Sequence, residues 1–139
     1  MASPPYGYRR GERVEKRFLV DASTAAIVAG DFLVAGTAGY VQQAAAGELP
    51  VGVAMQSVAS PSADGDVSCL VDISPHTEYE FPPDEGTVTQ GLVGTTMDVG
   101  GAQSVNIDAS ADDILVCVGV DTVANTLRVQ LIPTFAGVA

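Results

Sequence analysis

Positive charge is scarce in this sequence, and so are the side chains from which most catalytic and metal sites are built. Its 139 residues include no tryptophan, one histidine, two cysteines and six Lys or Arg residues. The chain contains no Gly-x-Ser-x-Gly, phosphate loop, dinucleotide-binding fingerprint or Cys-x-x-Cys. Because an enzyme needs a placed nucleophile, base or metal, this inventory favours a protein without catalytic activity and implies no cofactor.

Long apolar runs and helical periodicity are lacking as well. No stretch reaches the roughly 18 apolar residues of a transmembrane helix, so we expect no membrane partner. The N-terminus lacks the apolar core of a signal peptide. The best helical window, Ala22–Val28, is short and rich in alanine, which argues against stable helices.

Short β-like runs separated by turn residues fill the chain from Phe18 onward. The spacing predicts the strands 32–35, 40–43, 51–58, 66–73, 76–81, 88–93, 114–120 and 126–131. Residues Ile114–Val120 are apolar on both faces, which predicts a central, fully covered strand. The expected fold is all-β, a compact β-barrel or β-sandwich (β-tulip-like) formed by residues 18–139 as a single domain.

The few bases are concentrated at the N-terminus. Residues 1–17 carry five of the six bases and two acids, hence +3, whereas residues 18–139 carry 15 acids and one base, hence −14. Prolines and glycines in this basic segment predict an extended arm that stays mobile until it binds a partner. The predicted docking residues combine aromatic and cationic groups: Tyr6, Tyr8, Arg9, Arg10, Arg13, Lys16 and Arg17. Nucleic acid is the less favoured partner, because the acidic body repels phosphate.

Two smaller features leave alternatives open. His76, Glu78 and Glu80 would share one face of a strand and could hold a divalent metal, but a solvated polar face explains them more simply, so no metal is predicted. Cys69 and Cys117 lie in apolar runs and read as buried thiols, although two positions do not exclude a disulfide.

Two stretches carry a family resemblance. One runs from Ala29-Gly30-Asp31-Phe32-Leu33-Val34 to Leu49-Pro50-Val51-Gly52-Val53-Ala54, and the other from Leu115-Val116-Cys117-Val118-Gly119-Val120 to Leu127-Arg128-Val129-Gln130-Leu131-Ile132. In this order of strand, turn and closing alternating strand, the chain resembles the head decoration (capsid cement) proteins of tailed bacteriophages.

The resemblance implies a structural virion protein, made in the host cytoplasm and located on the outer capsid surface. It would bind the major capsid protein, bridge neighbouring capsomers and form a homotrimer. Residues 1–17 would dock on the shell, and their deletion should weaken binding while the body stays folded. The uncharged C-terminus, with Phe135 and Val138, is a candidate subunit interface. The alternatives are an adhesion or carbohydrate-binding module of a tail or surface fibre and, less favoured, a small hydrolase or metal enzyme.

Overall fold

The computed structural model describes residues 7–22, 24, 26–108 and 114–132. These residues form eleven strands and two short 3-10 helices, and none of them lies in an α-helix. The strands are β1 (Gly7–Arg10), β2 (Glu15–Leu19), β3 (Phe32–Ala35), β4 (Val41–Gln43), β5 (Gly52–Ala54), β6 (Ser68–Asp72), β7 (Glu78–Phe81), β8 (Thr96–Gly101), β9 (Ser104–Asn106), β10 (Leu115–Asp121) and β11 (Thr126–Leu131). The 3-10 helices are η1 (Thr37–Gly39) and η2 (Gln90–Leu92).

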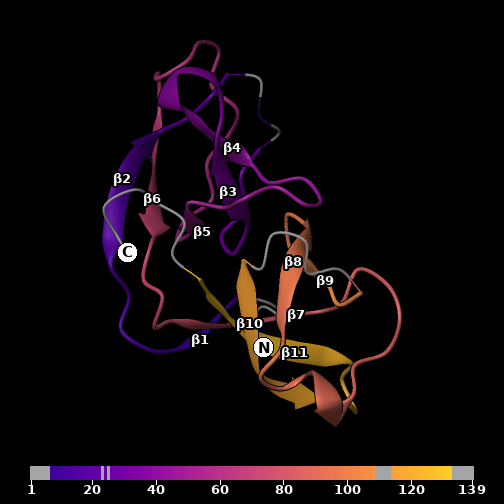
Figure 1. Cartoon of the computed structure of the whole chain (residues 1–139). Coiled ribbons are helices and arrows are strands. Elements are labelled where there is room, and N and C mark those ends of the chain that lie inside the picture. Colours follow the sequence, from indigo (N-terminus) through magenta and orange to yellow (C-terminus); the bar gives the residue numbers. More distant parts are fainter. Residues whose placement is uncertain (1–6, 23, 25, 109–113, 133–139) are drawn as a thin grey trace.

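The strands divide between two antiparallel sheets that lie one above the other (Figure 1). One sheet has six strands in the order β1-β7-β11-β10-β8-β9, and the other has five in the order β2-β6-β5-β3-β4. The expected all-β class is therefore confirmed, in a compact arrangement that resembles a sandwich.

In each sheet, an edge strand approaches the opposite side of the sheet through a single bridge. Val20, after β2, forms a single parallel bridge with Val41 of β4, and Pro83, after β7, forms one with Val105 of β9. Single bridges do not continue into ladders, so neither sheet closes into a full barrel within the described residues.

The central strands β3 and β5 of the five-stranded sheet are buried on both faces, which explains their continuous apolar runs. Successive residues of a strand point to opposite faces. Phe32 and Val34 thus enter the larger core shared with the six-stranded sheet, whereas Leu33 enters a smaller core on the other side. In the larger core, the ring centroids of Phe32 and Phe81 lie 4.6 Å apart, which joins the two sheets directly.

Most predicted strands are present, and the errors are informative. β3 and β11 have the predicted bounds, and β10 lies between β8 and β11 as a central strand should. It is not fully covered, because the side chain of Val118 is 37% exposed. The strand predicted over 88–93 is wrong, since those residues contain η2 and otherwise form turn and coil.

Candidate functional site

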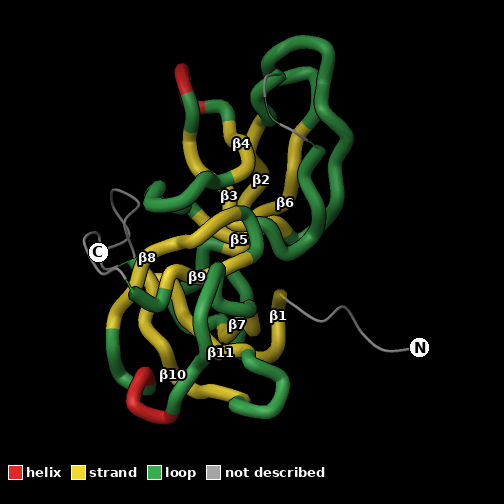
Figure 2. Tube along the Cα trace, turned by 90° about the vertical axis from the view of Figure 1, so that its right-hand side faces the viewer, coloured by secondary structure: helices red, strands yellow, loops and turns green. Residues whose placement is uncertain are grey.

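The basic N-terminal segment is part of both sheets. β1 pairs with β7 at the edge of the six-stranded sheet, and β2 pairs with β6 at the edge of the five-stranded sheet (Figure 2). We call residues 7–19 the N-terminal strap. The predicted boundary between residues 17 and 18 falls inside β2, so over residues 7–17 the expected mobile arm is corrected to a pair of sheet strands. Tyr6, Phe135 and Val138 lie outside the described residues.

The strap turns from one sheet to the other at Gly11. This residue has φ = +104°, a conformation that residues with a Cβ rarely adopt. A Cβ there would lie 2.4 Å from the carbonyl oxygen of His76 and 2.9 Å from the Cα of Thr77. The backbone of the strap therefore lies directly on the loop before β7, at a distance that only glycine allows.

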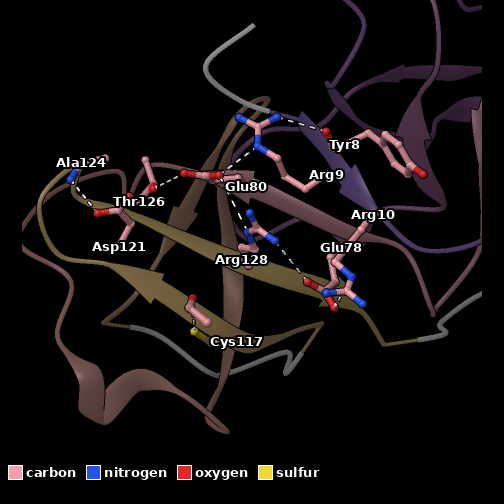
Figure 3. Close-up of polar contacts among 11 residues, drawn as sticks. Tyr8, Arg9, Arg10, Glu78, Glu80, Cys117, Asp121, Ala124, Thr126 and Arg128 are labelled. Atoms are coloured by element: carbon pink, nitrogen blue, oxygen red, sulfur yellow. Dashed lines mark hydrogen bonds and ion pairs between the residues drawn. The ribbon is translucent and has the colours of Figure 1, made fainter. Parts of the chain in front are cut away.

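A ladder of charges fastens β1 to the sheet (Figure 3). Arg9 Nε lies 2.9 Å from Glu80 Oε1, and Arg10 Nε lies 3.9 Å from Glu78 Oε2. Arg128, the one base outside the first 17 residues, approaches Glu78 at 3.8 Å and Glu80 at 3.9 Å. The two glutamates that were considered as metal ligands thus serve as anions between three arginines.

Glu80 is the best enclosed member of this ladder. Burial alone would raise the pKa of its carboxyl group, but hydrogen bonds from Thr126 Oγ1 and Arg9 Nε, with the charges of Arg9 and Arg128, outweigh burial and lower it. A carboxyl group with a lowered pKa stabilises the fold above its unfolded-state pKa of about 4.3. That contribution is lost as the pH falls through the folded-state pKa.

This linkage gives a first prediction for Glu80→Gln. From about pH 5 down to about pH 2, the thermal midpoint of the wild-type protein should fall more than that of the variant. The two curves should converge in acid, because the wild-type carboxyl group is then protonated too. Circular dichroism melts across this pH range measure the difference. Parallel curves at all pH values would show that Glu80 has the same pKa in the folded and unfolded states.

Four of the predicted docking residues remain on the surface, and one of them is Tyr8, which is 39% exposed. The side chain of Arg10 is 71% exposed, and Lys16 and Arg17 are exposed on β2. Arg17 also donates a hydrogen bond to Ser68 Oγ at 2.9 Å, which orients its guanidinium along the sheet edge. The strap therefore presents cations to solvent along β2 while it turns others inward.

No described strand pairs with the outer side of β2, which is the edge of the five-stranded sheet. Val20 N donates to Val67 O, and Ile73 N donates to Val14 O, each at 3.0 Å. In an antiparallel pair, alternate residues form the hydrogen bonds to a given neighbour. The even-numbered residues of β2 therefore bond to β6, and its odd-numbered residues direct their N–H and C=O groups away from the sheet.

The inward-turned part of the strap borders a cavity of about 400 Å³ between the two sheets. Tyr8, Arg9 and Arg13 contribute to its wall, together with Asp72 and Tyr79 from β6 and β7. The sequence predicted the three strap residues as contacts on an outer surface. The structure gathers them around this cavity, which is partly open to solvent, and Tyr8 is 39% exposed.

Arg13 is unusual among the cavity residues. Its guanidinium carbon lies 3.6 Å from the centroid of the Tyr8 ring, a cation–π contact. The ring is fixed in turn, because Tyr8 Oη donates to the carbonyl oxygen of Gly11 at 3.0 Å. Arg13 Nε is buried and has no hydrogen-bond acceptor among the described residues. A buried donor without a partner lowers the stability of a protein by about 1–3 kcal/mol, so an acceptor bound at this atom would be stabilising.

Asp72 links the strap to the core of the molecule. Its side chain is fully buried, Oδ1 accepts hydrogen bonds from the backbone N–H groups of Val14 and Ser74 at 3.0 Å each, and Oδ2 accepts one from Tyr79 Oη. Burial, followed by the hydrogen bond to Asp72 and its charge, raises the pKa of Tyr79. The Tyr79 hydroxyl therefore stays protonated and donates to Asp72.

The structure also places the candidate metal ligand His76 and the two cysteines. His76 is exposed and precedes β7, and no group of three or more potential metal ligands occurs among the residues described. Cys69 and Cys117 are free, buried thiols in the smaller and the larger core respectively, so they do not form a disulfide. Burial raises the pKa of both thiols.

Two parts of the site escaped the sequence analysis. The alternation of residues 66–73 would place Asp72 on a polar outer face, but at Asp72 this face of β6 is covered by the strap and Tyr79. The pairing of Arg128 with Glu78 and Glu80 was also missed. The sequence did contain a signal for this pairing. Arg128 is the single base among residues 18–139, and it lies in a strand that alternates polar and apolar residues.

Comparison of the chain with protein-family models, curated proteins and solved structures gives no match. Among the described residues, no helix has the length and apolar character needed to cross a membrane.

Proposed function

We propose that the protein is a non-catalytic structural virion protein that binds the outer surface of a phage capsid and stabilises it by bridging neighbouring capsomers. The family resemblance described above implies this role. The observation that carries it here is the exposed β2 edge of the N-terminal strap, which combines cationic side chains with open backbone groups. Homotrimer formation belongs to the same proposal.

The chemistry of β2 suits docking on a protein surface. Strand addition supplies backbone hydrogen bonds, and pockets or charges beside the strand supply specificity. Lys16 and Arg17 favour a partner segment that is acidic, and they oppose pairing of β2 with a second β2, since their like charges would be brought together. Val14 and Leu19 at its two ends are each 49% exposed and add apolar area to the same edge. Docking through β2 thus requires no release of the strap.

The direct test uses capsids of the virus that encodes the chain, stripped of this protein. The double variant Lys16→Gln/Arg17→Gln should bind about tenfold more weakly at low salt, because a partner of opposite charge loses two contacts. The control Gln90→Glu/Thr122→Glu lowers the net charge by the same two units at exposed positions away from the strap. It should bind nearly as the wild type does. Equal weakening of both variants would show that total charge, and not β2, controls binding.

Copy number and subunit state test the wider proposal. Quantitative mass spectrometry of purified particles should find this chain at a level comparable to the major capsid protein, and native mass spectrometry should find a trimer. A handful of copies would favour the tail or fibre position of an adhesion module. Absence from particles would refute the virion role.

A further inference from the structure

The cavity beneath the strap combines a fixed cation with apolar walls. Arg13 and Tyr8 stand on one side, and Val53, Ala54 and Met55 contribute the wall from β5 and the residue after it. Gly7 and Gly30 meet closely at its border, since a Cβ on Gly7 would lie 3.6 Å from the Cα of Gly30. The hollow therefore lies between the two sheets and is bounded by segments far apart in the sequence.

The guanidinium of Arg13 is preorganised. The Tyr8 ring holds it by stacking, and the pairing of Tyr8 with Tyr79 holds the ring. A guanidinium presents its Nε–H and one terminal N–H as a planar fork that matches the two oxygens of a carboxylate. In the described part of the chain, Arg13 Nε is buried and lacks an acceptor, and Arg13 forms no ion pair.

We propose that this cavity is a binding site for a single carboxylate group carried on a short aliphatic chain. The carboxylate accepts hydrogen bonds from the Arg13 fork, and its methylene groups lie against Val53 and Met55. The cavity volume of about 400 Å³ is ample for a ligand or side chain of this size. The site is independent of the capsid role, because its residues are distinct from the exposed bases of β2.

Asp72 sets the charge that the ligand can carry. Its carboxylate also borders the cavity, and its oxygens already accept hydrogen bonds from Val14, Ser74 and Tyr79. It is therefore no competitor for the Arg13 fork, but its negative charge remains nearby. Like charges repel, and a dianion is repelled more strongly than a monoanion. A monocarboxylate should thus bind in preference to a phosphate dianion.

The test follows the Arg13 Nε–H resonance by NMR during titration with a blocked peptide, acetyl-Ala-Glu-Ala-amide. Saturable movement of this resonance is expected, with little movement for the matched peptide in which Gln replaces Glu. Arg13→Gln should weaken binding of the Glu peptide at least about tenfold, as expected when a charged hydrogen-bonding partner is lost. Arg10→Gln is the control, because it removes the same charge from an exposed side chain outside the cavity wall.

A second titration distinguishes the source of the carboxylate. Propionate offers the group as a free small molecule, and inorganic phosphate offers a more highly charged anion. Binding of propionate but not of the peptide would assign the site to a small metabolite-like acid, and binding of both would admit an acidic side chain of a partner. The proposal fails if neither saturates, if the Gln peptide binds as well as the Glu peptide, or if phosphate binds more tightly than propionate.

The variant Arg13→Lys distinguishes a loss of carboxylate binding from a loss of folded protein. Lysine keeps the charge and the long stem but lacks the planar fork. If its thermal midpoint stays near that of the wild type while carboxylate binding weakens, the fork itself binds the ligand. Undiminished binding by Arg13→Lys would overturn the assigned geometry.

Discussion

Gly11→Ala should destabilise the protein by about 3 kcal/mol and lower its thermal midpoint by about 10 °C. Two physical effects combine. The positive φ of +104° is unfavourable for alanine, and the added Cβ would lie 2.4 Å from the His76 carbonyl oxygen, which belongs to backbone that cannot swing aside. To relieve this clash the strap must move away from the loop before β7. Hydrogen exchange should therefore speed up most in β1 and at the facing edge of β7.

Gly39→Ala provides the matched control. Gly39 also has a positive φ, +85°, but a Cβ there would meet nothing within 4 Å. It should cost only the backbone strain, about 1 kcal/mol. If both variants lose the same stability, the contact between Gly11 and the loop is not the cause.

The second large effect is expected at Asp72. Asp72→Ala removes the acceptor of two backbone N–H groups and of the Tyr79 hydroxyl, and leaves all three donors in a buried site. Each buried donor left without an acceptor costs about 1–3 kcal/mol. After partial rearrangement, the free energy of unfolding should fall by about 4 kcal/mol in total. This is a large part of the 5–15 kcal/mol that stabilises a typical domain. Chemical denaturation of the wild type and the variant measures the difference.

Asp66→Ala is the control for loss of an aspartate near the same strand. Asp66 is exposed and accepts a hydrogen bond of 3.3 Å from Ser62. Its removal should change stability by no more than about 0.5 kcal/mol. A similarly small change for Asp72→Ala would mean that water enters the site and replaces the carboxylate.

The strands were predictable where local pattern and tertiary environment agree. Residues 126–131 alternate in sequence and have one face in the core, so β11 was found with its bounds. β8 and β9 were missed because glycines at their hairpin resemble a turn, although Gly100 and Gly101 belong to β8. Residues 88–93 show a strand-like composition, but no neighbouring strand pairs with them and they form η2 and turns instead.

The site was predictable in its residue types and not in its geometry. Clustered bases singled out the segment to Arg17, and charge alone placed it on an outer surface. The turn of the strap depends on its own Gly11 and on Asp72 and Glu80, which lie 58 and 71 residues from their partners in the strap. No local pattern encodes such distant pairing. β1 and the first three residues of β2 lie within residues 7–17, so deletion of residues 1–17 would take a strand from each sheet.

The position of the strap also determines the order in which the chain can fold. β1 and β2 are synthesised first, but their partners β7 and β6 follow only after some 50–70 residues, as the separations of 51, 58 and 71 residues between bonded pairs show. Long loops must close before these contacts form, and such topologies fold slowly. The strap residues leave the ribosome before their partners and should thus be among the last to reach their native places. Until they do, both partner strands remain open to pairing with other chains, which makes a nascent or truncated chain prone to aggregation.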